Sequence, residues 1–290
     1  MARIDHTGLR RAARLVLGVD GTSAAWRRRP IAGGNEVTSY KKWCKPSKVT
    51  YVESHVIDVL TSATDEVGIT LLAAYLPSRY AETKSLTRIA ERFGKGQVAK
   101  FLQNKLPTKQ SARSGDLGEI LAAAFLEEDC GYVIGPSRLI QRDHQEWAMR
   151  GDDVLAARFD SSSKVHLIKG EAKSRAQAKS DTVKEARDGL QRSDGLPSPH
   201  SLTQFAERLL GTVNDDLGEE ILTLQLEDGI RPKIVTHLIF LFAGNNPISH
   251  VNVDLIAYKG DIAQRAVILQ VQAHQDFVRT VYERVIADRA

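Results

Sequence analysis

The chain has little cysteine and no long uninterrupted hydrophobic run. Its 290 residues include two cysteines, Cys44 and Cys130. These form no CxxC pattern or Cys/His cluster, so a structural zinc site is not expected, and two free thiols indicate a cytoplasmic protein. The longest apolar stretch, 234–243, is interrupted by Thr236 and His237 and is too short to span a bilayer. The first residues show no signal-peptide pattern, so no membrane association is expected.

Several common catalytic motifs are also missing. The chain contains no Gly-x-Ser-x-Gly nucleophile elbow, no HExxH and no GxGxxG, and its eight histidines are scattered. Serine hydrolysis, zinc proteolysis and dinucleotide binding therefore have no local support. Acidic residues and lysine remain as the side chains on which a catalytic site would depend.

The net charge of +4 conceals two strongly basic segments. Residues 1–50 carry eleven Lys or Arg against three Asp or Glu, and residues 84–113 carry eight against one. Such segments attract the nucleic-acid backbone without reading its sequence. The alternatives are a solvated helical face or a docking surface for an acidic protein. Within the second segment, Lys95 and Lys100 are candidate contacts to nucleic acid.

Two carboxylates and an amine fall within the short stretch 151–173. Gly151-Asp152-Asp153 precedes one apolar run, and Glu171-Ala172-Lys173 ends the next. The two runs are expected to form an antiparallel hairpin whose loop is the three serines at 161–163. The spacing therefore predicts that the two acidic positions approach each other across the hairpin.

The length of the loop decides which aspartate faces Glu171. With a three-residue loop, Asp160 faces Lys164 in a favourable opposite-charge pair, and Asp153 lies directly opposite Glu171. A two- or four-residue loop would place Asp152 there instead. The hairpin argument favours Asp153 and leaves Asp152 as the alternative.

This pattern suits a divalent metal. Mg²⁺ prefers oxygen ligands and is commonly held by one or two carboxylates. Asp153 and Glu171 would supply them, with the carbonyl of Ala172 as a third oxygen. Lys173 returns to the same face of the strand and can position a water for attack on a phosphodiester. The alternative is that these are ordinary charges at strand ends.

A third acid precedes the hairpin. Residues 114–126 have helical periodicity, and Glu119 falls in the first turn of the expected helix, after a linker at 107–115. Glu119 is therefore a candidate helix-borne acid of the same site. The alternative is a capping box, in which Asp116 and Glu119 satisfy backbone N–H groups at the start of the helix.

The order of these segments resembles the PD-(D/E)XK nuclease superfamily over residues 111–195. More closely, Gly115-Asp116-Leu117-Gly118-Glu119, the Gly151-Asp152-Asp153 turn and Lys169-Gly170-Glu171-Ala172-Lys173 are similar to the HamA family, the nuclease component of Hachiman-type anti-phage defence. The resemblance implies a restriction-endonuclease-like α/β core, with a mixed central sheet flanked by helices. It also implies Mg²⁺ dependence, with Mn²⁺ as a substitute, DNA as substrate and a helicase partner, HamB.

The resemblance assigns the catalytic positions to Asp153, Glu171 and Lys173, with Glu119 as the helix-borne acid. Asp153, Glu171 and Glu119 would hold the metal. The chain departs from the superfamily pattern because two adjacent aspartates follow Gly151, which again leaves Asp152 as an alternative ligand.

The remaining organisation is read coarsely. Residues 1–110 are expected to be a basic N-terminal region, with an α/β extension, that contacts DNA or a partner, and residues 111–290 a nuclease domain. A helix is expected over 176–191, where Lys184, Arg187 and Gln191 share one side and can touch a phosphate or solvent. Further expected elements are helices at 85–93, 97–102, 201–210 and 276–287 and strands at 234–242 and 251–258.

Two classes of function follow. The first is a metal-dependent DNA endonuclease or DNase controlled by a partner helicase. The second is a catalytically silent nucleic-acid-binding subunit of a helicase complex. The complete set of Asp153, Glu171 and Lys173 favours the first, because a decayed nuclease usually loses one of these groups.

Overall fold

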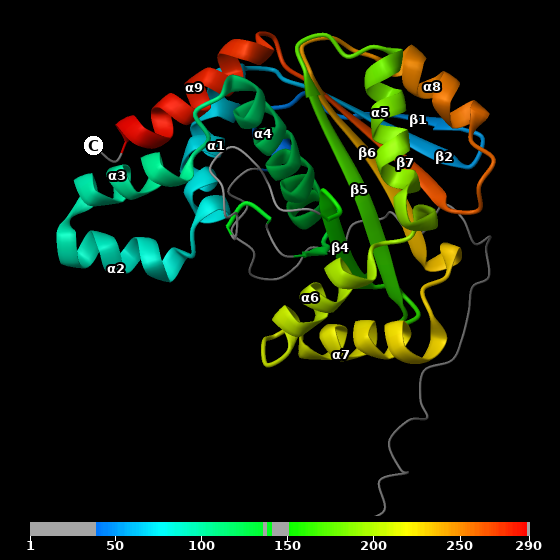
Figure 1. Cartoon of the computed structure of the whole chain (residues 1–290). Helices are drawn as coiled ribbons and strands as arrows, with labels where there is room; N and C mark the ends of the chain where they lie inside the picture. The colour runs from blue at the N-terminus through cyan, green and yellow to red at the C-terminus, as the bar shows by residue number, and fades with distance from the viewer. Residues whose placement is uncertain (1–38, 136–137, 141–150, 289–290) are drawn as a thin grey trace, which may run out of the picture.

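A mixed seven-stranded sheet forms the centre of the molecule and helices cover both of its faces (Figure 1). The computed structural model describes residues 39–135, 138–140 and 151–288. The strands are β1 (Lys48–Val52), β2 (His55–Thr61), β3 (Val133–Ile134), β4 (Val154–Phe159), β5 (Val165–Arg175), β6 (Val235–Ala243) and β7 (Ala263–Gln270). The α-helices are α1 (Asp65–Tyr80), α2 (Thr83–Phe93), α3 (Lys95–Lys105), α4 (Gln110–Ala124), α5 (Ser180–Gln191), α6 (Pro199–Leu209), α7 (Asp215–Thr223), α8 (Ile248–Ala257) and α9 (His274–Ala287).

The strand order is β1-β2-β7-β6-β5-β4-β3. The four middle strands, β2, β7, β6 and β5, are parallel, while β1 and β4 pair antiparallel with their neighbours. All nine residues of β6 are buried, as expected for a strand that is covered on both faces. This confirms the strand predicted at 234–242. The architecture is a mixed α/β fold consistent with the expected nuclease-like core.

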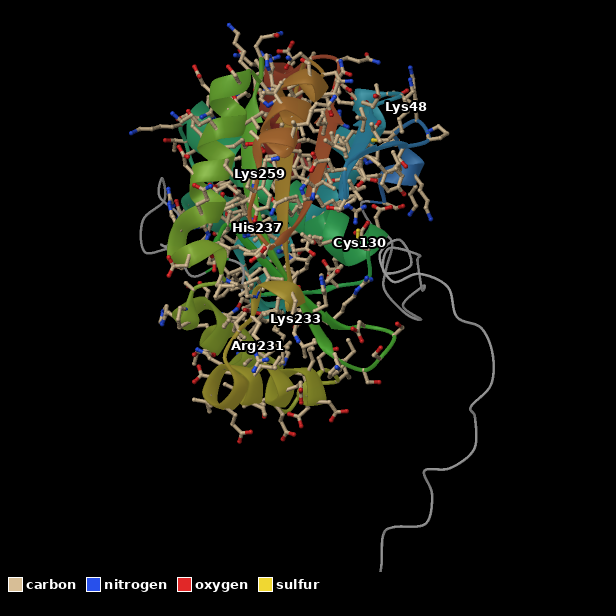
Figure 2. The ribbon with its side chains drawn as sticks, turned by 90° about the vertical axis from the view of Figure 1, so that its right-hand side faces the viewer. Lys48, Cys130, Arg231, Lys233, His237 and Lys259 are labelled. Atoms are coloured by element: carbon tan, nitrogen blue, oxygen red, sulfur yellow. The ribbon has the colours of Figure 1, made fainter. Side chains whose placement is uncertain are left out.

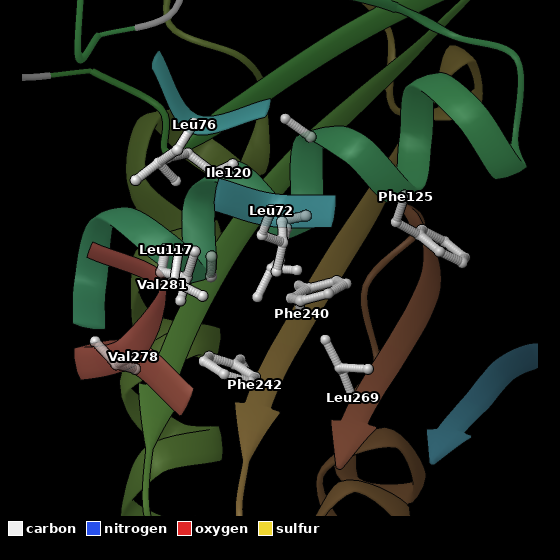
Figure 3. Packing of buried hydrophobic residues seen from close by; sticks show 14 of the residues in the cluster. Leu72, Leu76, Leu117, Ile120, Phe125, Phe240, Phe242, Leu269, Val278 and Val281 are labelled. Carbon is white, nitrogen blue, oxygen red and sulfur yellow. The ribbon is translucent and has the colours of Figure 1, made fainter. Parts of the chain in front are cut away.

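The largest hydrophobic core lies between the sheet and helices α1, α4 and α9. Figure 3 shows Phe240 and Phe242 of β6 among the apolar side chains of these helices, including Leu72 of α1 and Ile120 of α4. Successive residues of a strand point to opposite faces. Accordingly Ile239 belongs to a second core on the other face, formed with α5 and α8. Helices α4 and α5 are thus packed against the sheet through separate hydrophobic cores.

Strands from both sides of the expected boundary at residue 110 share this sheet. β1 and β2 precede the boundary, and β2 pairs directly with β7 near the C-terminal end of the chain. No helix within residues 39–135, 138–140 and 151–288 is both long and apolar enough to cross a membrane. The thiols of Cys44 and Cys130 are free.

Two expectations about helices and strands are wrong. The expected linker at 107–115 is largely helical, because α4 begins at Gln110. Residues 251–258 form most of α8 and not a strand. Their apparent alternation is misleading because Val251 and Leu255, four residues apart, are the two buried positions, as on one face of a helix.

His237 of β6 is a buried histidine whose ring nitrogens both have partners. Its Nε2 donates to the carbonyl of Gly195 at 2.7 Å, and Gln264 donates to its Nδ1 at 3.1 Å. In the view of Figure 2 it lies between Lys259 and Lys233. Burial lowers the pKa of His237 to about 4, although the hydrogen bond to Gly195 acts in the opposite direction. The neutral ring is therefore part of the packed core.

Acid is expected to destabilise the fold through His237. Because the pKa is about 6.5 when unfolded and about 4 when folded, its contribution is complete above pH 6.5 and is lost as the pH falls through 4. Lowering the pH from 7 to 5 should cost about 2 kcal/mol at this residue. His237→Gln should reduce the pH dependence of the unfolding free energy, measured by urea denaturation at both pH values. Exposed His200 is the control position, and an unchanged dependence in His237→Gln would contradict the assignment.

Candidate active site

The β4–β5 hairpin has the predicted register. Ala156 pairs with Ile168, and Val154 pairs with Gly170, so residue numbers across the pair keep a constant sum. The loop closes where the amide of Asp160 donates to the carbonyl of Lys164 at 2.8 Å. The side chain of Asp160 does not pair with the Lys164 ammonium; it accepts the backbone N–H groups of residues 162 and 164. The turn is therefore fixed locally by an aspartate that accepts turn amides.

In this register the side chains of the two adjacent aspartates contact different partners. Asp153 lies one residue before β4, across from Glu171, and its Oδ2 accepts the amide of Ala172 at 3.3 Å. Asp152 is directed elsewhere: its Oδ2 accepts the amide of Ser198 at 2.9 Å, and its Oδ1 lies 3.7 Å from the Lys169 ammonium. The structure thus brings Asp153 to Glu171, while Asp152 anchors the loop before α6.

Glu171 and Lys173 form an ion pair on β5. The Lys173 Nζ donates to Glu171 Oε1 at 2.6 Å, and Glu171 is only 8% exposed. Helix α5 covers the carboxylate with Gly189. A Cβ atom at position 189 would lie 2.3 Å from the Glu171 Cδ, which real atoms do not approach. The absence of a side chain at Gly189 therefore leaves the space that the Glu171 carboxylate occupies.

Glu119 reaches the same region from α4. This helix begins at Gln110, so Glu119 lies in its third turn and Asp116 is in mid-helix. The capping-box alternative is therefore wrong, because neither residue is near the unsatisfied N–H groups of the helix start. Asp116 is buried and accepts the hydroxyl of Tyr80 at 2.5 Å.

Arg138 connects Glu119 with Asp153. Its Nη2 donates to Glu119 Oε1 at 2.7 Å and to Asp153 Oδ1 at 2.6 Å, while its Nη1 donates to the carbonyl of Gly151 at 3.2 Å. Both ion pairs are largely shielded, since the side chains of all three charged residues are 16–17% exposed. The two acids therefore share one guanidinium.

Burial, and to a smaller extent the neighbouring acids, raises the pKa of two of these carboxyl groups. Burial raises the pKa of Glu119 to about 8; Arg138 lowers it and Asp153 raises it. Burial also raises the pKa of Glu171, followed by the effect of Asp153, against the lowering effect of Lys173. Burial and neighbouring negative charge favour the neutral form of a carboxyl group. A nearby cation therefore stabilises the ionised form of such a group strongly.

The donor chemistry of the site fits Mg²⁺, because Glu119, Asp153 and Glu171 offer carboxylate oxygens of the kind that this hard cation prefers. Their present arrangement pairs each one with a basic side chain. Among residues 39–135, 138–140 and 151–288, no three His, Cys, Asp or Glu side chains are grouped so as to hold a metal ion. The guanidinium of Arg138 occupies the position between Glu119 and Asp153.

The candidate nucleic-acid contacts on α5 do not share one surface. Lys184 and Gln191 are exposed, but Arg187 is 7% exposed. Its guanidinium donates to Asp254 at 2.6 Å and also bonds Gln264. Arg187 therefore joins α5 to α8 and β7, and of the three only Lys184 and Gln191 face solvent.

Lys95 and Lys100 lie on α3, which with α2 forms an arm that projects beside α1 and α9 (Figure 1). Both lysines are exposed. Gly94 ends α2 with φ +82°, a conformation that glycine adopts readily, which confirms the predicted break between the two helices. Most of the second basic segment is thus a helical hairpin, and its last residues begin α4, the helix that carries Glu119.

Sequence reasoning missed Arg138 and Gly189. A glycine within an otherwise helical segment is a usable signal, because it often marks a close approach of the helix to another group. Arg138 carried no such signal. It is separated from Glu119 by 19 residues and from Asp153 by 15, and nothing in its neighbours indicates that it turns towards either.

The mixed sheet flanked by helices makes the chain an α/β protein whose fold is consistent with a nuclease-like core. Its β4–β5 hairpin brings Asp153 to Glu171, with Lys173 beside it. The chain belongs to the HamA family, whose family model matches residues 36–285. A relative from Bacillus cereus, described as Hachiman protein HamA, is 29% identical over 175 residues. That match covers 59% of this chain and 62% of the relative, so the chain spans less than two thirds of the curated protein it resembles.

Proposed function

We propose that this chain is a Mg²⁺-dependent deoxyribonuclease that acts in anti-phage defence under the control of a helicase partner. Membership of the HamA family and the likeness to a Hachiman protein support the defence role. One observation carries the catalytic part of the proposal: Asp153 lies opposite Glu171 at the hairpin, with the Lys173 ammonium 2.6 Å from the Glu171 carboxylate.

Each side chain has a defined role in this proposal. Asp153 and Glu171 bind the cation, and Glu119 supports it from α4. The bound metal would supply charge stabilisation at the scissile phosphate and an activated water. Lys173 would position an attacking water, because its ammonium lies on the same face of β5 as Glu171 and is held beside it.

Exposed lysines that could contact DNA lie on two separate parts of the fold. The α2–α3 arm carries the exposed Lys95 and Lys100, and Lys184 is exposed on α5, the helix that covers Glu171. Cations of this kind bind the phosphate backbone without base readout. This distribution favours DNA contact through backbone charge, while Arg187 acts inside the fold.

A catalytically silent binding subunit is the competing function. Binding alone does not require a buried acid beside a lysine. A buried carboxylate lowers the stability of the fold, so a binding subunit would gain nothing from it. Glu171 is nevertheless buried, and α5 leaves room for it at Gly189. This buried and costly arrangement favours the nuclease.

The proposal is tested by DNA cleavage with the full chain, alone and with its helicase partner, on supercoiled, nicked and linear DNA. Cleavage is expected with Mg²⁺, and also with Mn²⁺, and removal of the metal with EDTA should abolish it. Restoring the metal should restore cleavage. If no DNA form is cut by the chain or the complex in the presence of either metal, the chain is not a nuclease and the binding-subunit function takes its place.

A further inference from the structure

One nitrogen atom of Arg138 lies between two carboxylates that belong to the candidate metal site. Nη2 is 2.7 Å from Glu119 Oε1 and 2.6 Å from Asp153 Oδ1. The second terminal nitrogen, Nη1, donates to the carbonyl of Gly151 at 3.2 Å. The guanidinium therefore contacts a helix, the residue before β4 and the backbone carbonyl of Gly151.

The positive charge of Arg138 stabilises the two acids. Glu119 and Asp153 come from separate elements, and their side chains are each 17% exposed. Two shielded carboxylates repel each other unless a cation lies between them. Arg138 supplies that cation, and its two contacts of 2.7 and 2.6 Å have the short lengths of charge-assisted hydrogen bonds.

A divalent cation at this site would need oxygens of the same two carboxylates. Mg²⁺ binds carboxylate oxygens at about 2.0–2.1 Å, closer than the nitrogen of Arg138 lies now. Two cations that bind the same pair of carboxylates also repel each other strongly in a partly buried site. The guanidinium and the metal therefore compete for Glu119 and Asp153.

We propose that Arg138 is an internal competitor of the divalent metal: its guanidinium occupies the acid pair of Glu119 and Asp153 and has to leave before the metal binds. This inference rests on the proposed function, since it takes these two acids as part of the metal site. It adds a built-in restraint to the nuclease. Metal binding, and with it cleavage, depends on whatever draws the guanidinium away from the acids.

Metal binding in the absence of DNA tests the inference. Mn²⁺ is titrated into the full chain, and free Mn²⁺ is followed by electron paramagnetic resonance. Arg138→Gln keeps a polar side chain and removes the charge, so Mn²⁺ affinity should rise at least about tenfold above that of the unchanged chain. In the double variant Arg138→Gln with Asp153→Asn the gain should disappear.

Arg279→Gln is the matched control, because it also removes one positive charge but from an exposed ion pair with Asp276 on α9. It should leave Mn²⁺ affinity unchanged. Circular dichroism and thermal melting check folding. If Arg138→Gln does not fold, Arg138→Lys is used instead. Its ammonium cannot reproduce the forked geometry of the guanidinium, so Mn²⁺ affinity should rise, but less than in Arg138→Gln.

Equal Mn²⁺ affinity in the unchanged chain and in a folded Arg138 variant would overturn the inference. A gain that survives Asp153→Asn would overturn it as well, because the metal would then lie elsewhere. Failure of the proposed function has a different signature. In that case Mn²⁺ affinity rises in Arg138→Gln, yet neither the unchanged chain nor the variant cuts DNA.

Discussion

Glu171→Gln is expected to lower Mg²⁺-dependent DNA cleavage by about a hundredfold or more while the protein stays folded. The substitution keeps the shape of the side chain and removes its negative charge, so the metal loses a ligand and Lys173 loses the acceptor 2.6 Å away. Removing one group that stabilises transition-state charge commonly costs about 10²–10³-fold in rate. Initial rates of plasmid cleavage at saturating Mg²⁺ measure the effect.

Stability should not explain this loss. Burial raises the pKa of Glu171, which means that the ionised carboxylate is disfavoured by its surroundings, and a neutral amide avoids that cost. Urea denaturation should therefore show a fold at least as stable as that of the unchanged chain. Glu185→Gln is the matched control because Glu185 is exposed and pairs with Arg175 at the surface. Full cleavage by Glu171→Gln would refute the catalytic assignment.

Gly189→Ala is expected to reduce cleavage by about a hundredfold without changing any charged group. The new methyl would lie 2.3 Å from the Cδ of Glu171 and 2.5–2.6 Å from its oxygens, so the carboxylate has to move. The moving group is the end of a flexible side chain, and alanine favours a helix over glycine by about 1 kcal/mol. The fold should therefore persist while the acid is displaced, and a displacement of about 1 Å can cost about 10²-fold in rate.

Gly115→Ala provides the control for this substitution. Gly115 also lies within a helix, α4, but a Cβ atom there would meet no other atom within 4 Å. This variant should gain stability from helix propensity and cleave DNA at the original rate. If Gly189→Ala is as active as Gly115→Ala, the position of the Glu171 carboxylate does not limit the reaction.

The β4–β5 hairpin was predictable because its determinants are local. A three-residue loop and the alternation of apolar residues fix which residues pair, and the structure has that register. Asp153 could therefore be placed opposite Glu171 from the sequence. The sequence could not show what Asp152 does, because its partners, Ser198 and Lys169, lie 46 and 17 residues away.

The sequence predicted a linker where α4 begins, because Gly115 and the polar residues before it are typical of a linker. Packing overrides that local preference: α4 joins the main core through Leu117 and Ile120, and tertiary burial supplies most of the stability of such a helix. Tertiary packing also explains α8. Val251 and Leu255 are buried on one face of this helix, although the local sequence alternates as in a strand.

The sequence by itself predicted the hairpin and favoured Asp153 opposite Glu171, with Lys173 on the same face, since short loops and strand alternation act over a few residues. The mixed α/β class was implied by the resemblance to a known nuclease family. Only the tertiary structure decided which side chains surround these groups. Arg138 meets Glu119 and Asp153, and Gly189 meets Glu171, across helices and loops that pack together after the strands are formed. Contacts of this kind depend on the relative placement of whole elements, which the pattern of a single strand or helix does not encode.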